Sequence, residues 1–200
     1  MLIGICGKMG SGKDWYTQNI IIPVLELYKK TYIPLALADQ IKINVMTQKN
    51  IKYDELYVQK TAESRNLLQQ LGTDEGRNVY GKDIWIKYHS NWTEIFEKKG
   101  INYIISPDIR FSNELLYVKE RGGIIIKLVA PKRNEQRLLQ ESNGDYIIYN
   151  KLKNHISECE LDNEKDESFD LIVNNEFDIS QDIINMRKIF NEKLNLNKNE

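Results

Sequence analysis

The sequence predicts an α/β fold of three layers: a parallel sheet of about five strands with helices on both faces, an inserted helical region and a lid. One observation is the glycine-rich segment 7–14, which directly follows the apolar run Leu2–Cys6. The other is the alternation of further short apolar runs with stretches of helical periodicity, which is typical of parallel strands joined by crossover helices. Such a sheet binds its ligand at the carboxyl ends of the strands.

The glycine-rich segment has the spacing of a phosphate-binding loop, G-x-x-x-x-G-K, because Gly7, Gly12 and Lys13 occupy the required positions. Glycines let backbone N–H groups turn inward around an anion, and the following helix directs the positive end of its dipole to the same place. We expect the ammonium of Lys13 to contact the outer phosphates of a nucleotide. The alternative, a glycine-rich turn that binds nothing, rarely combines a strand, this spacing and a lysine. The backbone that would hold phosphates comprises Lys8, Met9, Gly10, Ser11, Gly12, Lys13 and Asp14.

The candidate Mg²⁺ site departs from the general motif, because Asp14 stands where a Ser or Thr hydroxyl usually holds the ion. Asp14 could coordinate Mg²⁺ directly or through water, or Ser11 could reach it, and both alternatives stay open. Asp108 follows the apolar run Ile101–Ser106, where a protein with such a loop places an acid that holds Mg²⁺. Asp108 could instead cap the helix that begins near Ser112.

The remaining strands are predicted from short apolar runs. Pro34 favours an edge position or a late start for the second strand, and Pro107 is expected to end the third. The polar residues after the strands should gather beside the loop, since parallel strands end at one edge of the sheet. The predicted strands are Tyr32–Ala38, Ile101–Ser106, Ile124–Val129 and Phe169–Val173, and the polar residues are Asp39, Asp108, Arg110, Arg133, Asn174 and Asn175.

Helical periodicity covers Asp14 to about Lys30, although Pro23 predicts a kink or an end there. Residues 40–98 contain only helical patterns and form the predicted insertion, and the polar segment 131–165 forms the predicted mobile lid. We expect residues 1–194 to form one domain and residues 195–200 to be a frayed tail. The other predicted helices are Ile41–Met46, Tyr53–Leu71, Ile84–Phe96, Ser112–Arg121 and Ile179–Leu194.

Composition excludes several classes of protein. With 200 residues the chain has the length of one α/β domain, and its net charge of -1 creates no general attraction to nucleic acid or to membrane phosphates. Cys6 and Cys159 form neither a disulfide framework nor a metal cluster, which favours a reducing, cytoplasmic setting. No apolar run has the length of a membrane span, and a strand at the N-terminus leaves no room for a signal peptide.

Several charged residues are ambiguous from the sequence. Arg110 could contact a phosphate or lie on the surface, and the same holds for Asp39 and Lys42 after the second strand. The stretch Arg65–Arg77 breaks a helix with two glycines, which would let a ligand approach the backbone or would simply link two helices. His155 is one of two histidines, and a lone histidine is usually structural or exposed.

Six segments together resemble one family, the deoxynucleoside monophosphate kinases of bacteriophage type. The resemblance runs in order from Leu2 to about Leu194, and the elements LGTxxGR, DIRFxNE and HxSE are more specific than the loop. It implies a nucleoside monophosphate kinase-like P-loop fold that uses ATP and Mg²⁺ and converts a deoxynucleoside monophosphate to the diphosphate. The segments are GKMGSGKD, LALADQIK, RNLLQQLGTDEGR followed by DIW, PDIRFSNE followed by an RGG strand, HISE and DLIVNN.

The resemblance also implies roles for individual residues. Lys13, Asp108 and Arg110 would be catalytic, Asp14 and Asp108 would hold the metal, and Asp14 is itself common in the family, whereas Trp15 replaces a residue that is commonly Thr. Arg133 and Arg137 would lie on the lid. The implied acceptor-binding residues are Asp39, Lys42, Arg65, Gly72, Thr73, Arg77 and Arg110, with His155, Ser157 and Glu158 closing the acceptor side.

The implied chemistry is in-line phosphoryl transfer, which depends on positioning and on charge neutralisation by arginines and Mg²⁺. The partners would be small nucleotides, and neither the accepted base nor the formation of a homodimer follows from the sequence. Another small-metabolite kinase, such as a dephospho-coenzyme A or phosphomevalonate kinase, is an alternative, and so is an ATP-binding protein without activity. A GTPase switch is disfavoured, because Asn150–Lys153 lacks the acid of the N-K-x-D pattern.

Overall fold

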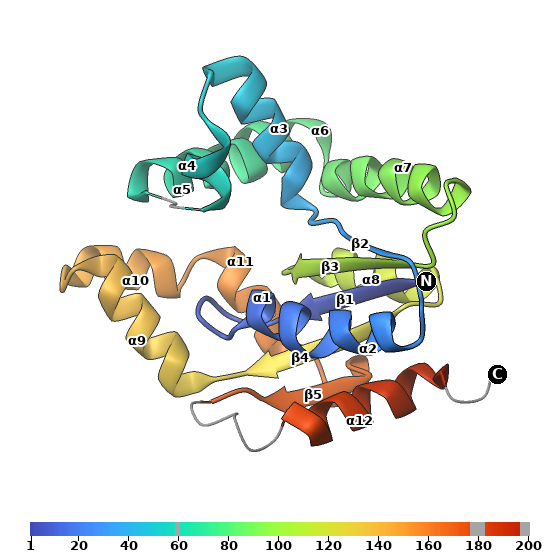
Figure 1. The fold of residues 1–200 in the computed structure, drawn as a ribbon. Helices are drawn as coiled ribbons and strands as arrows, with labels where there is room; N and C mark the ends of the chain where they lie inside the picture. The colour runs from blue at the N-terminus through green and yellow to red at the C-terminus, as the bar shows by residue number, and fades with distance from the viewer. Residues whose placement is uncertain (59–60, 177–182, 197–200) are drawn as a thin grey trace. The chain divides into compact units, whose positions relative to one another are not determined.

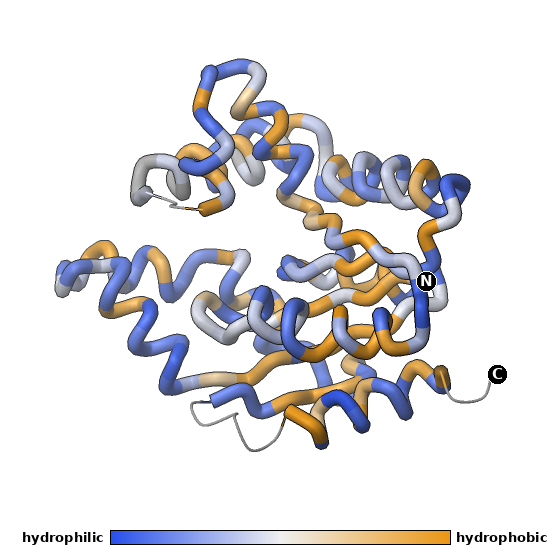
Figure 2. Tube along the Cα trace, in the orientation of Figure 1, coloured by the Kyte–Doolittle hydropathy of each residue, from blue (hydrophilic) through white to orange (hydrophobic). Residues whose placement is uncertain are grey.

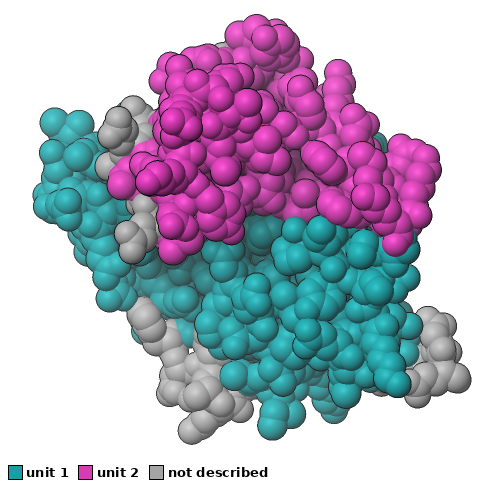
Figure 3. All heavy atoms as spheres, turned by 45° about the horizontal axis from the view of Figure 1, so that its top comes forward, with its two compact units in different colours: residues 1–34, 100–200 teal, residues 35–99 magenta. Residues whose placement is uncertain are grey.

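The computed structural model describes the chain except residues 59–60, 177–182 and 197–200, and it describes the backbone alone at positions 62, 63, 65, 66 and 74. The described residues fall into two compact units (Figure 3). Residues 1–34 and 100–200 form the first, here called the sheet unit, and residues 35–99 form the second, here called the helical unit. The predicted insertion, residues 40–98, lies within the helical unit, and the assignment of a single domain stays a prediction.

The sheet unit is built on a five-stranded sheet in which every pair of neighbouring strands is parallel, in the order β2-β3-β1-β4-β5 (Figure 1). The α/β prediction with about five parallel strands is therefore confirmed. The central strand is fully buried, which explains its continuous apolar sequence. The strands are β1 Leu2–Cys6, β2 Tyr32–Pro34, β3 Tyr103–Ile109, β4 Ile124–Val129 and β5 Leu171–Asn174.

One face of the sheet is covered by the N-terminal helical run and by α12 Ile183–Leu194 (Figure 1). Ile3 and Ile5 point into this layer, where they join a core that includes Tyr16 and Phe190. The helical run consists of α1 Lys13–Tyr16, the π-helical segment Thr17–Ile21 and α2 Ile22–Leu27. Pro23 lies in the first turn of α2 and does not end the run, because the wider π-helical turn before it accommodates a residue that lacks an N–H group.

The opposite face carries α8 Ser112–Glu120, which contacts β1 and β4. The strand before it, β3, does not stop at Pro107 as predicted but continues to Ile109. The pairing register shifts between β1 and β3 at this point, since Gly4 pairs with Ser106 and Cys6 with Ile109. Such a bulge tolerates a proline inside a strand, and it leaves Asp108 within β3.

Two other strand predictions differ in length from the structure. β2 ends at Pro34, and α3 Ala38–Lys49 begins soon after it, so that Asp39 lies in the first turn of a helix and not directly after a strand. Proline ends this edge strand early because it cannot donate a ladder hydrogen bond. β5 begins two residues later than predicted, at Leu171.

The segment predicted as a lid is helical. α9 Pro131–Ser142 is strongly hydrophilic along its length (Figure 2), and α10 Tyr146–Lys153 and α11 Ile156–Cys159 follow it. Asp145 caps α10, since its carboxylate accepts a hydrogen bond from the amide of Ile147 at 2.8 Å. Short 3-10 turns at Glu160–Asn163 and Asp166–Ser168 then lead to β5.

The helical unit contains no strand among its described residues, as the sequence predicted. Its elements are α3, α4 Tyr53–Tyr57, α5 Ala62–Gln69, the π-helical segment Gln70–Arg77, α6 Asn78–Tyr80 and α7 Ile84–Lys98. No helix in the described part of the chain has the length and apolar character that a membrane span requires. Leu196, which was expected in a frayed tail, is buried in the core of the sheet unit, and residues 197–200 lie outside the described residues.

Candidate active site

The glycine-rich loop has the backbone that its sequence predicts. Gly10 and Gly12 have φ angles of 81° and 85°, a region that favours glycine. A Cβ atom at Gly10 would lie 2.7 Å from the Cβ of Arg137, and one at Gly12 would lie 2.5 Å from Nδ2 of Asn175. The loop is therefore packed closely against α9 and the residue after β5, and no side chain fits at either glycine.

Side chains that follow β4 and β5 hold the loop in place. Asn134 Nδ2 donates a hydrogen bond to the carbonyl of Met9 at 2.7 Å, and Asn175 Nδ2 donates to the carbonyl of Ser11 at 2.6 Å. Arg133 Nη1 donates to the carbonyl of Asn175 at 2.9 Å. The sequence placed both residues at strand ends, with Arg133 expected on the lid and Asn175 without a role. It did not single out Asn134, since an asparagine inside a polar helix has no distinctive spacing.

Lys13 folds back over the loop. Its ammonium donates to the carbonyl of Gly7 at 2.6 Å and to that of Lys8 at 3.1 Å. Burial, together with the nearby charge of Arg110, lowers the pKa of Lys13 to about 8. The side chain thus remains mostly charged at neutral pH and lies where it can meet an anion bound in the loop.

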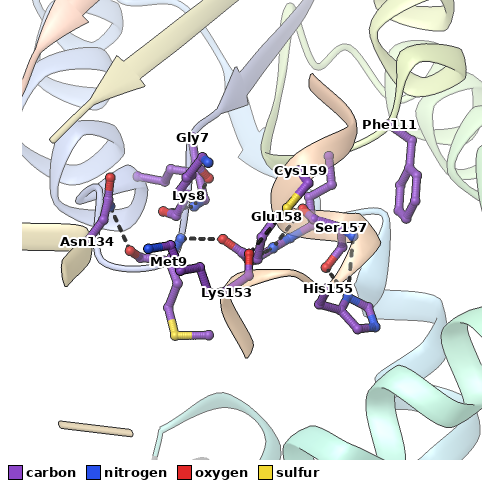
Figure 4. A network of polar contacts seen from close by, with 12 residues as sticks. Gly7, Lys8, Met9, Phe111, Asn134, Lys153, His155, Ser157, Glu158 and Cys159 are labelled. Atoms are coloured by element: carbon purple, nitrogen blue, oxygen red, sulfur yellow. Dashed lines mark hydrogen bonds and ion pairs between the residues drawn. The ribbon is translucent and has the colours of Figure 1, made fainter. Parts of the chain in front are cut away.

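Arg110 and Glu158 form an ion pair next to the loop, through Nη1 and Oε1. The second oxygen of Glu158 accepts a hydrogen bond from the amide of Met9 at 2.7 Å. In Figure 4, Met9 lies between Glu158 on one side and Asn134 on the other. Burial favours the neutral acid, but the charge of Arg110 and the hydrogen bond from Met9 outweigh it, so the pKa of Glu158 lies below its usual value.

The turn that carries Arg110 is fixed by another buried acid. Glu114 accepts hydrogen bonds from the amide of Arg110 at 2.7 Å and from that of Phe111 at 3.1 Å. Phe111 is the residue that precedes α8, whereas Asp108 lies in β3, where its charge acts on Arg110. Asp108 is thus beside the ion pair and not at the start of the helix.

The candidate metal ligands do not form a cage by themselves. Asp14 is exposed in the first turn of α1, and no group of three or more His, Cys, Asp or Glu among the described residues could hold a metal ion. Ser11 is fully buried, which argues against it as an Mg²⁺ ligand. Mg²⁺ is commonly held by one or two carboxylates together with substrate phosphates and water, and Asp14 and Asp108 fit that requirement.

The three residues of the HxSE element have different surroundings. His155 begins α11, where its Nδ1 accepts a hydrogen bond from the amide of Ser157 at 3.3 Å and lies 2.8 Å from Ser157 Oγ. The carbonyl of Ser157 accepts from Arg110 at 3.3 Å. Among these three side chains, Glu158 is the one that contacts the loop, while His155 and Ser157 bond to each other.

A pocket of about 450 Å³ opens beside the loop, within the sheet unit. The loop, the ends of β3 and β4, and the segment from α9 to the turn after α11 form its walls. Burial raises the pKa of Cys6, at its base, to about 12, so this thiol is not an effective nucleophile. Polar residues that line it include Lys8, Arg110, Asn134, Glu135, Lys153 and Glu158.

The predicted lid arginines both lie against the loop. A Cβ atom at Gly12 would be 3.0 Å from Nη1 and Nη2 of Arg133, and Arg137 lies over Gly10. Arg137 also pairs with Glu141 on the next turn of α9. The structure therefore brings Lys13, Arg110, Arg133 and Arg137 together around the loop.

In the helical unit, Asp39 and Lys42 are part of a compact polar network. Asp39 accepts hydrogen bonds from the amide of Ala36 at 2.8 Å, from Lys42 Nζ at 3.0 Å and from the hydroxyl of Tyr57 at 3.0 Å. Lys42 is buried, with Nζ 4.0 Å from the centre of the Tyr57 ring. These contacts join α3 to α4.

The LGTxxGR element of the helical unit packs around Trp85. Trp85 Nε1 donates to the carbonyl of Gly72 at 2.7 Å, and a Cβ atom at Gly76 would lie 2.4 Å from Cζ2 of the same ring. The space beside Gly76 is thus filled by an indole and not by a ligand. Thr73 and Arg77 belong to the same π-helical segment, and the side chain of Arg65 lies outside the described part of the chain.

Comparisons with known proteins agree with these features. The family model for deoxynucleotide monophosphate kinase matches residues 43–183, a range that begins after the glycine-rich loop. A protein of Acanthamoeba polyphaga mimivirus named "Putative deoxynucleotide monophosphate kinase" is 27% identical over 147 residues, which are 66% of this chain and 75% of that protein.

Two solved structures share the fold. Shikimate kinase from Bacteroides thetaiotaomicron superposes with a TM-score of 0.51 at 15% identity, over 98% of each chain. The protein TT1252 from Thermus thermophilus gives the same TM-score and identity, over 96% of this chain and 97% of its own. At this identity the likeness concerns the fold alone. The family match covers more than half of the residues, and the chain therefore belongs to the deoxynucleotide monophosphate kinase family.

Proposed function

We propose that this protein transfers the γ-phosphate of ATP to a deoxynucleoside 5′-monophosphate and so produces ADP and the deoxynucleoside diphosphate. The observation that carries the proposal is the placement of Lys13 and Arg110 beside a phosphate-binding loop in a member of this family. Transfer between two anions requires that cations gather where the phosphates meet, and four basic side chains lie around this loop.

The donor side is supported by the shape and chemistry of the loop. The side chains of Arg133, Arg137 and Asn175 pack against Gly10 and Gly12, and the backbone from Lys8 to Asp14 would bind the ATP phosphates. Lys13 would contact the outer phosphates, with Arg133 and Arg137 on the neighbouring helix. Asp14 and Asp108 would hold Mg²⁺, which would neutralise phosphate charge when bound.

The acceptor side is supported by Arg110. A deoxynucleoside monophosphate carries between one and two negative charges near neutral pH, and a guanidinium can bind two of its oxygens at once. Its phosphate oxygen is already a good nucleophile, so the site requires no strong general base. Contacts of Asp39, Lys42, Arg65, Gly72, Thr73 and Arg77 with the acceptor nucleotide remain part of this proposal.

A screen of acceptors with ATP tests the proposed activity by following the release of ADP. We expect turnover with one or more of dTMP, dGMP and hydroxymethylated dCMP, and none with dephospho-coenzyme A or phosphomevalonate. Turnover confined to the last two compounds would identify a different small-metabolite kinase. Tight ATP binding without turnover of any acceptor would indicate a binding protein without activity.

A further inference from the structure

We propose that Glu158 is a positioning residue of the phosphate-transfer site, which holds Arg110 and the Met9 amide in place and does not itself contact the substrate. The proposal rests on the proposed function, because it assigns Glu158 a role through Arg110 in that reaction. It replaces the simpler expectation that Glu158 binds the acceptor.

The two oxygens of Glu158 have separate partners. Oε2 accepts the hydrogen bond from the amide of Met9 at 2.7 Å, and Oε1 pairs with Nη1 of Arg110. The side chain of Glu158 is only 7% exposed. A buried carboxylate is costly unless both oxygens are satisfied, and here one cation and one amide satisfy them. Little of this carboxylate remains available for a sugar or a base.

The side-chain hydrogen bonds of Arg110 to the described residues all come from one nitrogen of the guanidinium, Nη1. Nη1 bonds to Glu158 and to the carbonyl of Ser157, and in the described part of the chain Nε and Nη2 have no hydrogen-bond partner. The side chain is 30% exposed, so the uncommitted N–H groups can meet a ligand. An arginine fixed in this way presents its remaining N–H groups to two phosphate oxygens without first losing side-chain freedom.

Charge balance supports the same role. Arg110 lies close enough to Lys13 to lower the pKa of that lysine, whereas Glu158 acts to raise it. The carboxylate thereby offsets the repulsion between two cations that must both be present before an anionic substrate arrives. The loss of this charge would disturb both partners even if the backbone stayed in place.

The segment around Glu158 is joined to the loop and to the Arg110 turn at two further points. The amide of Ser112 donates to Glu160 at 3.0 Å, and Lys8 Nζ pairs with Asp162 at 2.7 Å. Lys8 and Asp162 have side chains that are 46% and 47% exposed, so this pair should contribute little. Asp162 lines the pocket, so it is not a suitable control, whereas Glu167 is an exposed carboxylate on the segment that leads to β5 and does not line the pocket.

A different role would follow if Glu158 occupied the Met9 amide in place of a phosphate oxygen. Removal of a competing carboxylate would tighten ATP binding and would not slow transfer. A positioning residue has a different signature in Glu158→Gln. The glutamine oxygen can still accept the hydrogen bond from Met9, whereas the ion pair with Arg110 is lost, so the use of the acceptor weakens and ATP binding stays nearly unchanged. The two roles are separated by the KM values of the two substrates.

The first experiment compares wild-type protein, Glu158→Gln and the control Glu167→Gln with ATP and the best deoxynucleoside monophosphate. In Glu158→Gln we expect kcat/KM for the acceptor to fall about ten- to a hundredfold, the size typical of a lost charge-assisted contact. We expect the KM for ATP to change by less than about threefold and the Tm to stay near that of Glu167→Gln, which should resemble wild type. An unchanged acceptor kcat/KM, or a lower KM for ATP with undiminished kcat, would overturn the role of Glu158.

A double-mutant cycle tests whether Glu158 acts through Arg110. In an Arg110→Lys background the further change Glu158→Gln should reduce kcat/KM for the acceptor much less than it does in wild type, because the guanidinium is already absent. Fully additive losses would contradict the positioning role. Absence of wild-type turnover with every deoxynucleotide would overturn the proposed function and this inference together, whereas normal wild-type turnover with an unaffected Glu158→Gln would overturn the inference alone.

Discussion

The sheet unit and the helical unit use their polar residues in different ways. Around the glycine-rich loop, Lys13, Arg110 and Arg133 bond to backbone carbonyls or to one carboxylate, and their charges lie close to the backbone of the loop. In the helical unit, Asp39 has three hydrogen-bond partners from its own unit, and the indole of Trp85 fills the space beside Gly76.

This difference separates two kinds of predicted site residue. A polar side chain whose hydrogen bonds are completed within its own unit mainly stabilises that unit, because a ligand would have to displace existing partners. A guanidinium that bonds to the protein through only one of its nitrogens keeps its other N–H groups available for an anion. We therefore expect substitutions in the loop region to change catalysis and substitutions in the helical network to change stability first.

The largest effect is expected for Lys13→Ala. Loss of the ammonium should lower kcat by about 10²- to 10³-fold, as for the removal of one electrostatic stabiliser from a closed site. The Tm should change little. Steady-state kinetics with ATP and the best acceptor would measure the effect, with the exposed Lys119→Ala as the control. Undiminished turnover in a folded Lys13→Ala protein would contradict the assignment of the phosphate loop.

Arg110→Lys is expected to have the next largest effect on activity, although the charge is kept. An ammonium cannot reproduce the planar fork, so kcat/KM for the acceptor should fall by about 1.5 to 3 kcal/mol in free-energy terms, or roughly ten- to a hundred-and-fifty-fold. The KM for ATP should stay nearly constant. If only the KM for ATP changed, Arg110 would belong to the donor side.

Gly76→Ala should destabilise the helical unit. The added Cβ would lie 2.4 Å from the indole of Trp85 and 2.7 Å from the carbonyl of Leu71, so either the ring or the backbone must move. Overpacking of this kind costs about 1 to 3 kcal/mol, measurable by urea unfolding. Gly144→Ala is the control, because its Cβ would meet nothing within 4 Å and tests backbone strain alone at a φ of 78°. Because Gly76 has no positive φ, an unchanged unfolding free energy in Gly76→Ala would show that packing against Trp85 is unimportant.

Asp39→Asn should cost about 1 to 2 kcal/mol of unfolding free energy, because it weakens the charge-assisted bond to buried Lys42 and the bonds to Ala36 and Tyr57. Tyr57→Phe should cost less, since it removes the hydrogen bond to Asp39 but keeps the charge of Asp39 and its bonds to Lys42 and Ala36. Urea unfolding of both variants, with the KM for the acceptor measured in parallel, decides whether Asp39 stabilises its own unit or contacts the ligand. A large rise in KM without a loss of stability would place Asp39 among the ligand contacts.

The smallest expected effect is a difference between the two cysteines in their rate of alkylation. Cys6 is 1% exposed in β1 and burial raises its pKa to about 12, so it should resist alkylation at neutral pH, whereas partly exposed Cys159 should react. Mass spectrometry after brief treatment with iodoacetamide should find one modified thiol in the folded protein and two in urea. Rapid modification of Cys6 in the folded state would show that the base of the pocket is open.

The sequence by itself determined the α/β class, the parallel sheet and the backbone of the glycine-rich loop. These features are encoded locally: a continuous apolar run predicts a buried strand, and the spacing of Gly7, Gly12 and Lys13 specifies a backbone that only glycine can adopt at two positions. Local patterns also predicted the helical insertion, since residues 40–98 carry helical periodicity alone. Each of these predictions depends on residues that are neighbours along the chain.

Only the tertiary structure decided how the loop is held and which cations meet there. Met9 contacts Glu158 across 149 positions and Asn134 across 125, and no periodicity in the sequence connects such partners. The extension of β3 through Pro107 also depends on residues far away in the sequence, because it requires a register shift in the pairing of β3 with the N-terminal strand β1. Packing of α7 against the segment Gln70–Arg77 also filled the space beside Gly76 with Trp85, because a glycine permits close approach without specifying whether a ligand or another side chain will use it.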